Sequence, residues 1–206
     1  MRDIIIVGGG PSGCFTGKKL AKKGFDVTII EEDNQIGHPM CCAGIVGDGG
    51  MRELELDPSR WSLNKLREGV VYSPNNESVR ISRDKLEAHC IKRSDFDKDL
   101  AISAAKEGAE IRLNSKCLDV SRDENGVSVK VKENNGTEEL RGRIIVGADG
   151  ANSMVARNFN LIEEFSPLAG VQAEVVGESK SEAANIFFKN EWTEHFFAWV
   201  VPAGGV

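Results

Sequence analysis

The chain has 206 residues, of which 40% are hydrophobic and 28% charged, and its formal net charge is −6. The length allows one large domain or one domain with part of another, and the acidic balance argues against nucleic acid as the main partner. No apolar run reaches the roughly 18 residues that a membrane span needs. Five cysteines without zinc-site spacing indicate reduced thiols in a cytoplasmic protein, and three histidines without ligand spacing predict no metal site.

The first elements predicted form a strand–helix–strand unit of about thirty residues. Residues 3–7 (DIIIV) predict a short buried strand, residues 14–23 an amphipathic helix that Gly24 ends, and residues 25–30 a second strand. A glycine-rich turn, Gly8–Gly13, joins the first strand to the helix. It fits the pattern GxGxxG in the context that dinucleotide binding requires.

Each glycine of this turn has a separate purpose in such a site. Gly8 lets the chain turn sharply, Gly10 lets a pyrophosphate approach the backbone, and Gly13 lets helix and strand pack closely. Pro11 and Ser12 lie at the helix start, where free N–H groups bind an anion. We therefore expect these five residues to bind a cofactor. The other interpretation is a glycine-rich turn without a ligand.

An acidic residue ends the second strand of this unit. Glu31 follows Gly13 by 18 residues, and an acid at that point can accept hydrogen bonds from both ribose hydroxyls of an adenosine. It would repel a 2′-phosphate, so the site suits FAD or NAD rather than NADP. Glu32 is an alternative, but Glu31 is the first residue beyond the strand. The other interpretation is a solvated acidic strand end.

The middle of the chain predicts further strands and one helix. Residues 66–84 resemble a β-hairpin and residues 86–92 a further strand. Ser94 is a candidate cap for the next helix, with Asp97 completing a capping-box-like pair. The rest is predicted as strands: several over residues 109–141, and a buried one over 143–146 that ends at the Gly-Ala-Asp-Gly of residues 147–150.

The pattern changes near residue 165. Longer alternating strands with aromatic residues are predicted over 169–176, 184–188 and 195–201. We therefore expect one domain over residues 1–165 and a second over 166–206, which the hairpin of residues 66–84 would join. The chain stops directly after a strand, which predicts that the second domain is incomplete.

Residues 144–157 (IIVGADGANSMVAR) resemble the second flavin motif of the p-hydroxybenzoate hydroxylase-like flavoproteins. The resemblance implies FAD as the cofactor. In that group the Asp-Gly pair serves the ribose and pyrophosphate region, which makes Asp149 and Gly150 the matching residues. Arg93 is similar to the group's flavin-contacting arginine at a helix start.

A narrower resemblance covers residues 4–205. Residues 39–44 (PMCCAG) fit PxxCxG, and residues 197–202 (FAWVVP) are similar to an aromatic-x-Trp-x-Phe-Pro strand. Both are marks of the geranylgeranyl reductase family, which includes archaeal digeranylgeranylglycerophospholipid reductases. Two departures stand out: Val201 replaces the usual phenylalanine, and the family's third flavin motif, a Gly-Asp-Ala segment, is absent.

This resemblance implies an α/β fold, with a Rossmann-like FAD-binding domain of the glutathione-reductase type and the start of a mostly antiparallel β substrate domain. It implies that reduced FAD delivers a hydride to C=C bonds of geranylgeranyl chains in membrane lipids or their precursors. Cys42 would be a catalytic and flavin-site residue, and Phe197, Trp199 and Pro202 would bind substrate.

The implied partners are an isoprenoid lipid and an external electron donor, with reduced ferredoxin, a nicotinamide and a deazaflavin as candidates. Because the substrate is a lipid, the protein is expected to be cytoplasmic and peripheral to the membrane.

Other readings stay open from the sequence. An FAD-dependent monooxygenase or halogenase shares the first two motifs, and a truncated, inactive nucleotide-binding fragment is the second alternative. Cys42 also fits a small buried core residue. Phe197 and Trp199 also fit the plain core of a sheet, where strict alternation would place them on one face and Phe196 on the other.

Overall fold

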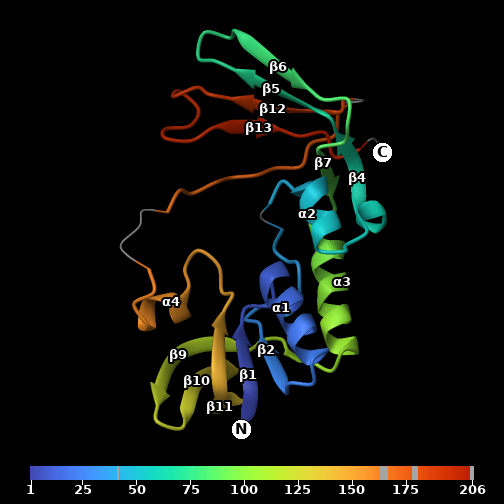
Figure 1. Cartoon of the computed structure of the whole chain (residues 1–206). Helices are drawn as coiled ribbons and strands as arrows, with labels where there is room; N and C mark the ends of the chain where they lie inside the picture. The colour runs from blue at the N-terminus through green and yellow to red at the C-terminus, as the bar shows by residue number, and fades with distance from the viewer. Residues whose placement is uncertain (41, 163–166, 178–180, 205–206) are drawn as a thin grey trace. The chain divides into compact units, whose positions relative to one another are not determined.

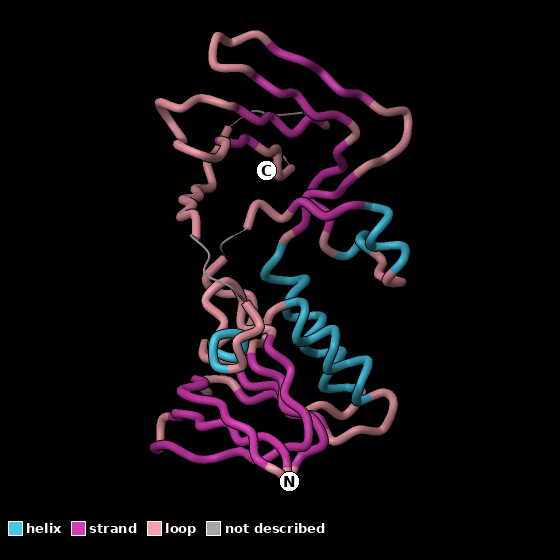
Figure 2. Tube along the Cα trace, turned by 60° about the vertical axis from the view of Figure 1, so that its left-hand side comes forward, coloured by secondary structure: helices cyan, strands magenta, loops and turns pink. Residues whose placement is uncertain are grey.

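The computed structural model describes residues 1–40, 42–162, 167–177 and 181–204 (Figures 1 and 2). Strands make up most of the regular structure, as the magenta segments of Figure 2 show. The chain divides into two compact units, each built from two separate stretches of sequence. The first unit comprises Met1–Met40 and Ser94–Pro167, and the second comprises Cys41–Arg93 and Leu168–Val206.

The first unit contains a six-stranded sheet in the order β8-β2-β1-β11-β10-β9. Strands β8, β2, β1 and the end of β11 run parallel, whereas β11, β10 and β9 form antiparallel pairs. The bounds are β1 Arg2–Val7, β2 Val27–Ile30, β8 Glu110–Arg112, β9 Lys116–Asp123, β10 Gly126–Glu133 and β11 Gly136–Gly147.

Alternation of side chains along β1 explains why residues 4–7 of this strand are all apolar. Ile4 and Ile6 belong to a buried cluster that includes Ala21 of helix α1 (Pro11–Ala21) and Ala104 of helix α3 (Arg93–Lys106). Ile5 and Val7 face the other way, into a cluster that includes Val155 of helix α4 (Met154–Asn158). Residues 4–7 are buried on both faces of the sheet, so each of these positions favours an apolar side chain.

The second unit contains a four-stranded sheet in the order β13-β12-β5-β6 and a three-stranded sheet in the order β3-β7-β4. Only the pair of β5 and β12 is parallel among these ladders. Its elements are β3 Ile45–Gly47, α2 Asp48–Glu53, the 3₁₀ helix Pro58–Arg60, β4 Ser62–Leu66, β5 Glu68–Tyr72, β6 Ser78–Ser82, β7 Ala88–Ile91, β12 Ala183–Phe187 and β13 Ala198–Val200.

Several predicted elements are confirmed. The strand, helix and strand at the start of the chain are β1, α1 and β2, and the hairpin predicted for residues 66–84 is β5 and β6. The strand predicted for residues 86–92 is β7, and residues 109–141 contain strands throughout.

Other predictions are wrong. Helix α3 begins at Arg93, so Ser94 lies inside its first turn rather than at the cap position, and its Oγ donates to Asp95 Oδ1. Residues 143–146 are the end of the long strand β11, and the side chain of Ile144 is 55% exposed rather than buried.

The strand predicted for residues 169–176 is also wrong, since this part of the described chain has no regular structure. Val171 is 93% exposed, so the alternation of apolar residues in this segment does not bury the Val171 side chain. An alternating sequence becomes a strand only when a neighbouring strand pairs with it.

Candidate functional site

The predicted cofactor residues of the first unit gather at one edge of its sheet. The Gly8 N–H donates to the Ile30 carbonyl at 2.8 Å, and the Ala148 N–H donates to the Val7 carbonyl at 2.8 Å. These bonds join the carboxyl ends of β2, β1 and β11, which lie side by side in Figure 1. The glycine-rich turn, the acid after β2 and the Asp-Gly turn after β11 therefore meet at the edge where α/β sheets bind ligands.

The glycines of the turn are required for two different reasons. A Cβ atom on Gly8, whose φ is +103°, would lie 2.2 Å from the Ala148 carbonyl oxygen, and one on Gly13 would lie 2.0 Å from the Gly8 carbonyl oxygen. A Cβ atom on Gly10 would meet nothing within 4 Å. Gly8 and Gly13 thus allow close packing, whereas Gly10 leaves open space beside the backbone, as a bound pyrophosphate needs.

Helix α1 begins next to the open space beside Gly10. Gly10 is its N-cap, Pro11 occupies its first turn, and no side chain caps it. The first N–H groups of a helix have no partner within the helix. Ser12 is exposed, and the first turn carries no acidic residue. This end of α1 therefore fits a negatively charged phosphate.

Glu31 reaches the glycine-rich turn directly. Its Oε2 accepts from the Gly9 N–H at 2.7 Å, and its Oε1 accepts from the Asp33 N–H at 3.0 Å. Glu32 instead forms an exposed ion pair with Lys116 at 2.7 Å. The two neighbouring acids thus have different surroundings, and Glu31 is the one that lies beside the turn.

The carboxylate of Asp149 caps helix α4. Its Oδ1 accepts from the Ser153 Oγ at 2.6 Å, and its Oδ2 accepts from the Met154 N–H at 2.6 Å. Ser153 is the N-cap residue, and its Oγ accepts from the Ala156 N–H at 2.9 Å. Ser153 was not among the predicted site residues, although a serine just before a helix is a common cap signal.

The two thiols of the first unit that lie near this edge are unsuited to nucleophilic chemistry. Burial raises the pKa of the Cys14 thiol to about 12, and its S–H donates to the Gly9 carbonyl at 3.0 Å. Burial, with the charge of Asp149 adding, raises the pKa of Cys117 to about 11. Both thiols are therefore protonated near neutral pH.

The other predicted flavin-site residues belong to the second unit. Cys42 is half-buried, its Sγ accepts from the Gly44 N–H at 3.4 Å, and its carbonyl accepts from the Gln172 amide at 3.2 Å. The neighbouring Cys41 of the same motif lies outside the described residues. Arg93 is half-buried at the first position of α3.

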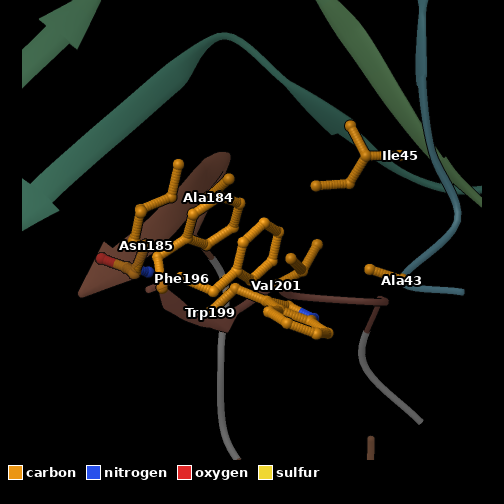
Figure 3. Close-up of a pocket in the computed structure, with 9 residues that line it drawn as sticks. Ala43, Ile45, Ala184, Asn185, Phe196, Trp199 and Val201 are labelled. Carbon is orange, nitrogen blue, oxygen red and sulfur yellow. The ribbon is translucent and has the colours of Figure 1, made fainter. Parts of the chain in front are cut away.

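The second unit also contains an apolar pocket of about 300 Å³ (Figure 3). In the figure, Ala43 and Ile45 lie across from Phe196 and Trp199. Phe197 also lines the pocket, and Pro202 is buried without lining it. The complete lining is Ala43, Ile45, Ala184, Asn185, Ile186, Phe196, Phe197, Trp199 and Val201.

The expectation that Phe196 faces away from Phe197 is wrong. Both rings line the pocket, stacked with their centroids 4.2 Å apart. Strand β13 begins only at Ala198, and Phe196 lies in a bend. Because the alternation of side chains is a property of extended strands, it does not extend to Phe196.

A buried chain of polar side chains, which no sequence pattern indicated, links the three-stranded sheet to helix α2. His89 is 4% exposed, and its Nε2 lies 3.1 Å from Asp48 Oδ1. Its Nδ1 lies 3.1 Å from the Ser62 Oγ. These residues are far apart in sequence, and no spacing pattern links them. None of these three residues lines the pocket, so we interpret the chain as a structural tie between helix α2 and the sheet.

Comparisons with known proteins agree with this geometry. The FAD binding domain family matches residues 1–195. An uncharacterized protein of Methanocaldococcus jannaschii is 34% identical over 98% of this chain and 51% of its own length. Digeranylgeranylglycerophospholipid reductase 3 of Methanosphaera stadtmanae is 30% identical over 98% of this chain and 53% of its own length.

A solved structure has a similar fold. A geranylgeranyl bacteriochlorophyll reductase-like protein of Thermoplasma acidophilum gives a TM-score of 0.83 at 23% identity, covering 98% of this chain and 54% of its own. The chain spans about half the length of the curated relatives it matches. Its α/β fold with mixed sheets, the open space beside Gly10 and the uncapped start of α1 fit a dinucleotide. The chain belongs to the FAD-binding domain family, and its cofactor is FAD.

Proposed function

We propose that this chain is part of an FAD-dependent oxidoreductase that reduces C=C bonds in geranylgeranyl chains of membrane lipids or their precursors. The observation that carries the proposal is the presence, in one chain, of a sheet edge that fits a dinucleotide and of a pocket whose lining residues, apart from Asn185, are all apolar. The curated relatives named digeranylgeranylglycerophospholipid reductase support it.

The first unit holds the cofactor in this proposal, as a Rossmann-like domain of the glutathione-reductase type. Gly8, Gly10 and Gly13, with Pro11 and Ser12 at the start of α1, form the cradle for the pyrophosphate. Glu31 binds the ribose hydroxyls while fixing the turn through the Gly9 N–H. Asp149 and Gly150 support the pyrophosphate from the turn after β11, and Arg93 contacts the flavin. Bound and reduced, FAD supplies the hydride.

The pocket of the second unit holds the isoprenoid chain. Phe197 and Trp199 supply aromatic walls, with ring centroids 6.2 Å apart, and Pro202 lies two residues after the end of β13. Apolar walls exclude water from the reacting double bond. Cys42 directly precedes the wall residue Ala43, and we assign it to the reaction site beside the flavin.

Two domains divide these tasks in the proposal: an FAD-binding domain over residues 1–165 and a substrate domain begun by residues 166–206. The hairpin of β5 and β6 belongs with the substrate domain. The pairing of β5 with β12 supports that assignment, because it places the hairpin in the same sheet as β12 and β13.

A peripheral membrane contact is also proposed, with the loop between β12 and β13 as its site. Phe188, Trp192 and Phe196 are 45%, 58% and 48% exposed there, and Phe196 also lines the pocket. Aromatic side chains favour the membrane interface. No helix in the described residues is long and apolar enough to cross a membrane. A blue shift of Trp192 emission with lipid vesicles tests the contact, and unchanged emission contradicts it.

Anaerobic reduction of the FAD-loaded chain, followed by addition of a geranylgeranyl lipid, tests the reaction itself. Chemical reduction makes the assay independent of the natural electron donor, which we propose to be external: reduced ferredoxin, a nicotinamide or a deazaflavin. The reductase proposal expects reoxidation of the flavin and a lipid heavier by two hydrogens per reduced bond. Reoxidation only with O₂ and an aromatic substrate would instead indicate a monooxygenase or halogenase. A reduced flavin that the lipid never reoxidises would indicate a nucleotide-binding fragment.

A further inference from the structure

We propose that Asn64 is a positioning residue that sets the distance between the two walls of the apolar pocket. This inference rests on the proposed function only for the identity of the ligand. The spacing itself follows from hydrogen bonds of the side-chain amide of Asn64, which is not a pocket residue.

The two walls of the pocket are associated with different sheets of the second unit. Ala43 and Ile45 form one wall, and Ile45 belongs to β3 of the three-stranded sheet. Ile45 pairs with Cys90 of β7, and Cys90 pairs on its other side with Asn64 of β4. The three residues thus form one row across the sheet, with a pocket wall at one end and Asn64 at the other.

The opposite wall is a hairpin whose two ends are both held by Asn64. Its Nδ2 donates to the Ser181 carbonyl at 3.0 Å and to the Pro202 carbonyl at 3.0 Å. Ser181 lies two residues before β12, and Pro202 follows the wall residue Val201. The chain between these two bonds supplies seven lining residues: Ala184, Asn185, Ile186, Phe196, Phe197, Trp199 and Val201.

Both the nitrogen and the oxygen of the Asn64 side-chain amide form hydrogen bonds in this arrangement. A primary amide has two N–H donors, and here each has its own carbonyl acceptor. The Oδ1 accepts from the Lys65 N–H at 2.9 Å, which fixes which end of the amide faces the hairpin. An aspartate at this position has the same shape and no donors when ionised, so it would face two carbonyl oxygens with negative charge.

A β-bulge presents Asn64 to the hairpin. The register of β4 against β7 shifts between Ser62 and Asn64, leaving Leu63 as the extra residue. Bulges of this kind re-aim side chains. The Leu63 carbonyl oxygen lies against Gly204, whose φ is +90° and where a Cβ atom would come within 2.5 Å. Backbone and side chain of the bulge therefore both hold the segment that follows β13.

The fluorescence of Trp199, which lines the pocket, measures the position of this wall without any ligand. With Trp61→Phe and Trp192→Phe as background, Trp199 is the one remaining tryptophan of the three in the sequence. In Asn64→Asp we expect acrylamide to quench Trp199 at least twofold more strongly than in the background protein. The matched control is Val70→Ala, which removes buried core from β5 without touching the amide. It should lower the melting temperature and leave Trp199 quenching unchanged.

The ligand readout is the ratio of the dissociation constants for farnesol and geranylgeraniol. A change of one methylene in the fit of an apolar pocket alters selectivity by about tenfold or more, so we expect this ratio to move about tenfold in Asn64→Asp and to stay constant in Val70→Ala. Should Asn64→Asp fail to fold, Gly204→Ala displaces the same segment from the bulge and is expected to move both readouts.

The two proposals fail separately. A background protein that binds neither alcohol contradicts the isoprenoid function, while the quenching of Trp199 still measures the spacing of the walls. If Asn64→Asp and Gly204→Ala are folded and neither changes the quenching relative to Val70→Ala, Asn64 does not position the wall.

Discussion

The Gly8 backbone and the Ala148 carbonyl approach so closely that a single methyl group on Gly8 would lie 2.2 Å from that oxygen. The contact joins two turns that are about 140 residues apart in sequence. It exists because β1 and β11 are parallel neighbours, with Val7 opposite Gly147. Substitutions at the glycine-rich turn should therefore affect either the fold or the cofactor, depending on which glycine is changed.

Gly10→Val is expected to abolish FAD uptake without unfolding the chain, because its side chain would occupy the open space where the pyrophosphate must come. Gly13→Val is the contrasting variant, since a Cβ atom there collides with the Gly8 backbone and should prevent folding. Circular dichroism and the visible flavin spectrum measure the two effects. A yellow Gly10→Val protein would refute the assignment.

Glu31→Gln should weaken FAD binding by about tenfold to a hundredfold, because hydrogen bonds to a charged group contribute about 1.5–3 kcal/mol. The variant also places an amide N–H₂ against one of the two backbone N–H groups that Glu31 now accepts from. Glu32→Gln is the control, since it removes only an exposed ion pair with Lys116 and should change affinity little. Titration with FAD compares them, and equal losses would show that Glu31 has no special part.

The Cys14 thiol predicts a loss of stability at alkaline pH. Burial raises its pKa from 9.0 to about 12, so the fold favours the protonated thiol. Its contribution is complete below pH 9 and is lost as the pH rises from 9 towards 12, at up to about 1.4 kcal/mol per pH unit. Denaturant unfolding of the wild type and Cys14→Ala measures the difference between them. Parallel pH curves for the two proteins would contradict this prediction.

Trp199→Ala should weaken the use of long isoprenoid chains, or change which double bonds are reduced, while FAD stays bound. The ring is part of the pocket wall, and its removal enlarges an apolar site. Phe25→Ala is the control, because Phe25 is 43% exposed, lies in the first unit and is not a lining residue. Rates and product patterns with lipids of different chain length decide the matter. Unchanged rate and range in Trp199→Ala would mean that the aromatic strand is only core.

Local patterns in the sequence were sufficient for the elements whose causes are local. The apolar run of β1, the glycines before α1 and the hairpin of β5 and β6 are each determined by neighbouring residues, and all three are confirmed. The pattern failed where an element depends on a distant partner. Residues 169–176 alternate as a strand would, yet no ladder pairs with them in the described chain. Phe196 leaves the alternation because β13 begins two residues later.

The sequence by itself determined the residue types of the glycine-rich turn: glycines at positions 8, 10 and 13 and an acid at 31, each with a local physical reason. Only the tertiary structure decided which of these groups meet. The order β2-β1-β11 brings Glu31 and Asp149 to the edge where Gly8 turns, and the bulge at Leu63 directs Asn64 to two carbonyls more than a hundred residues away. Such contacts depend on strand order and register, which come from burial summed over the whole sheet rather than from any short segment.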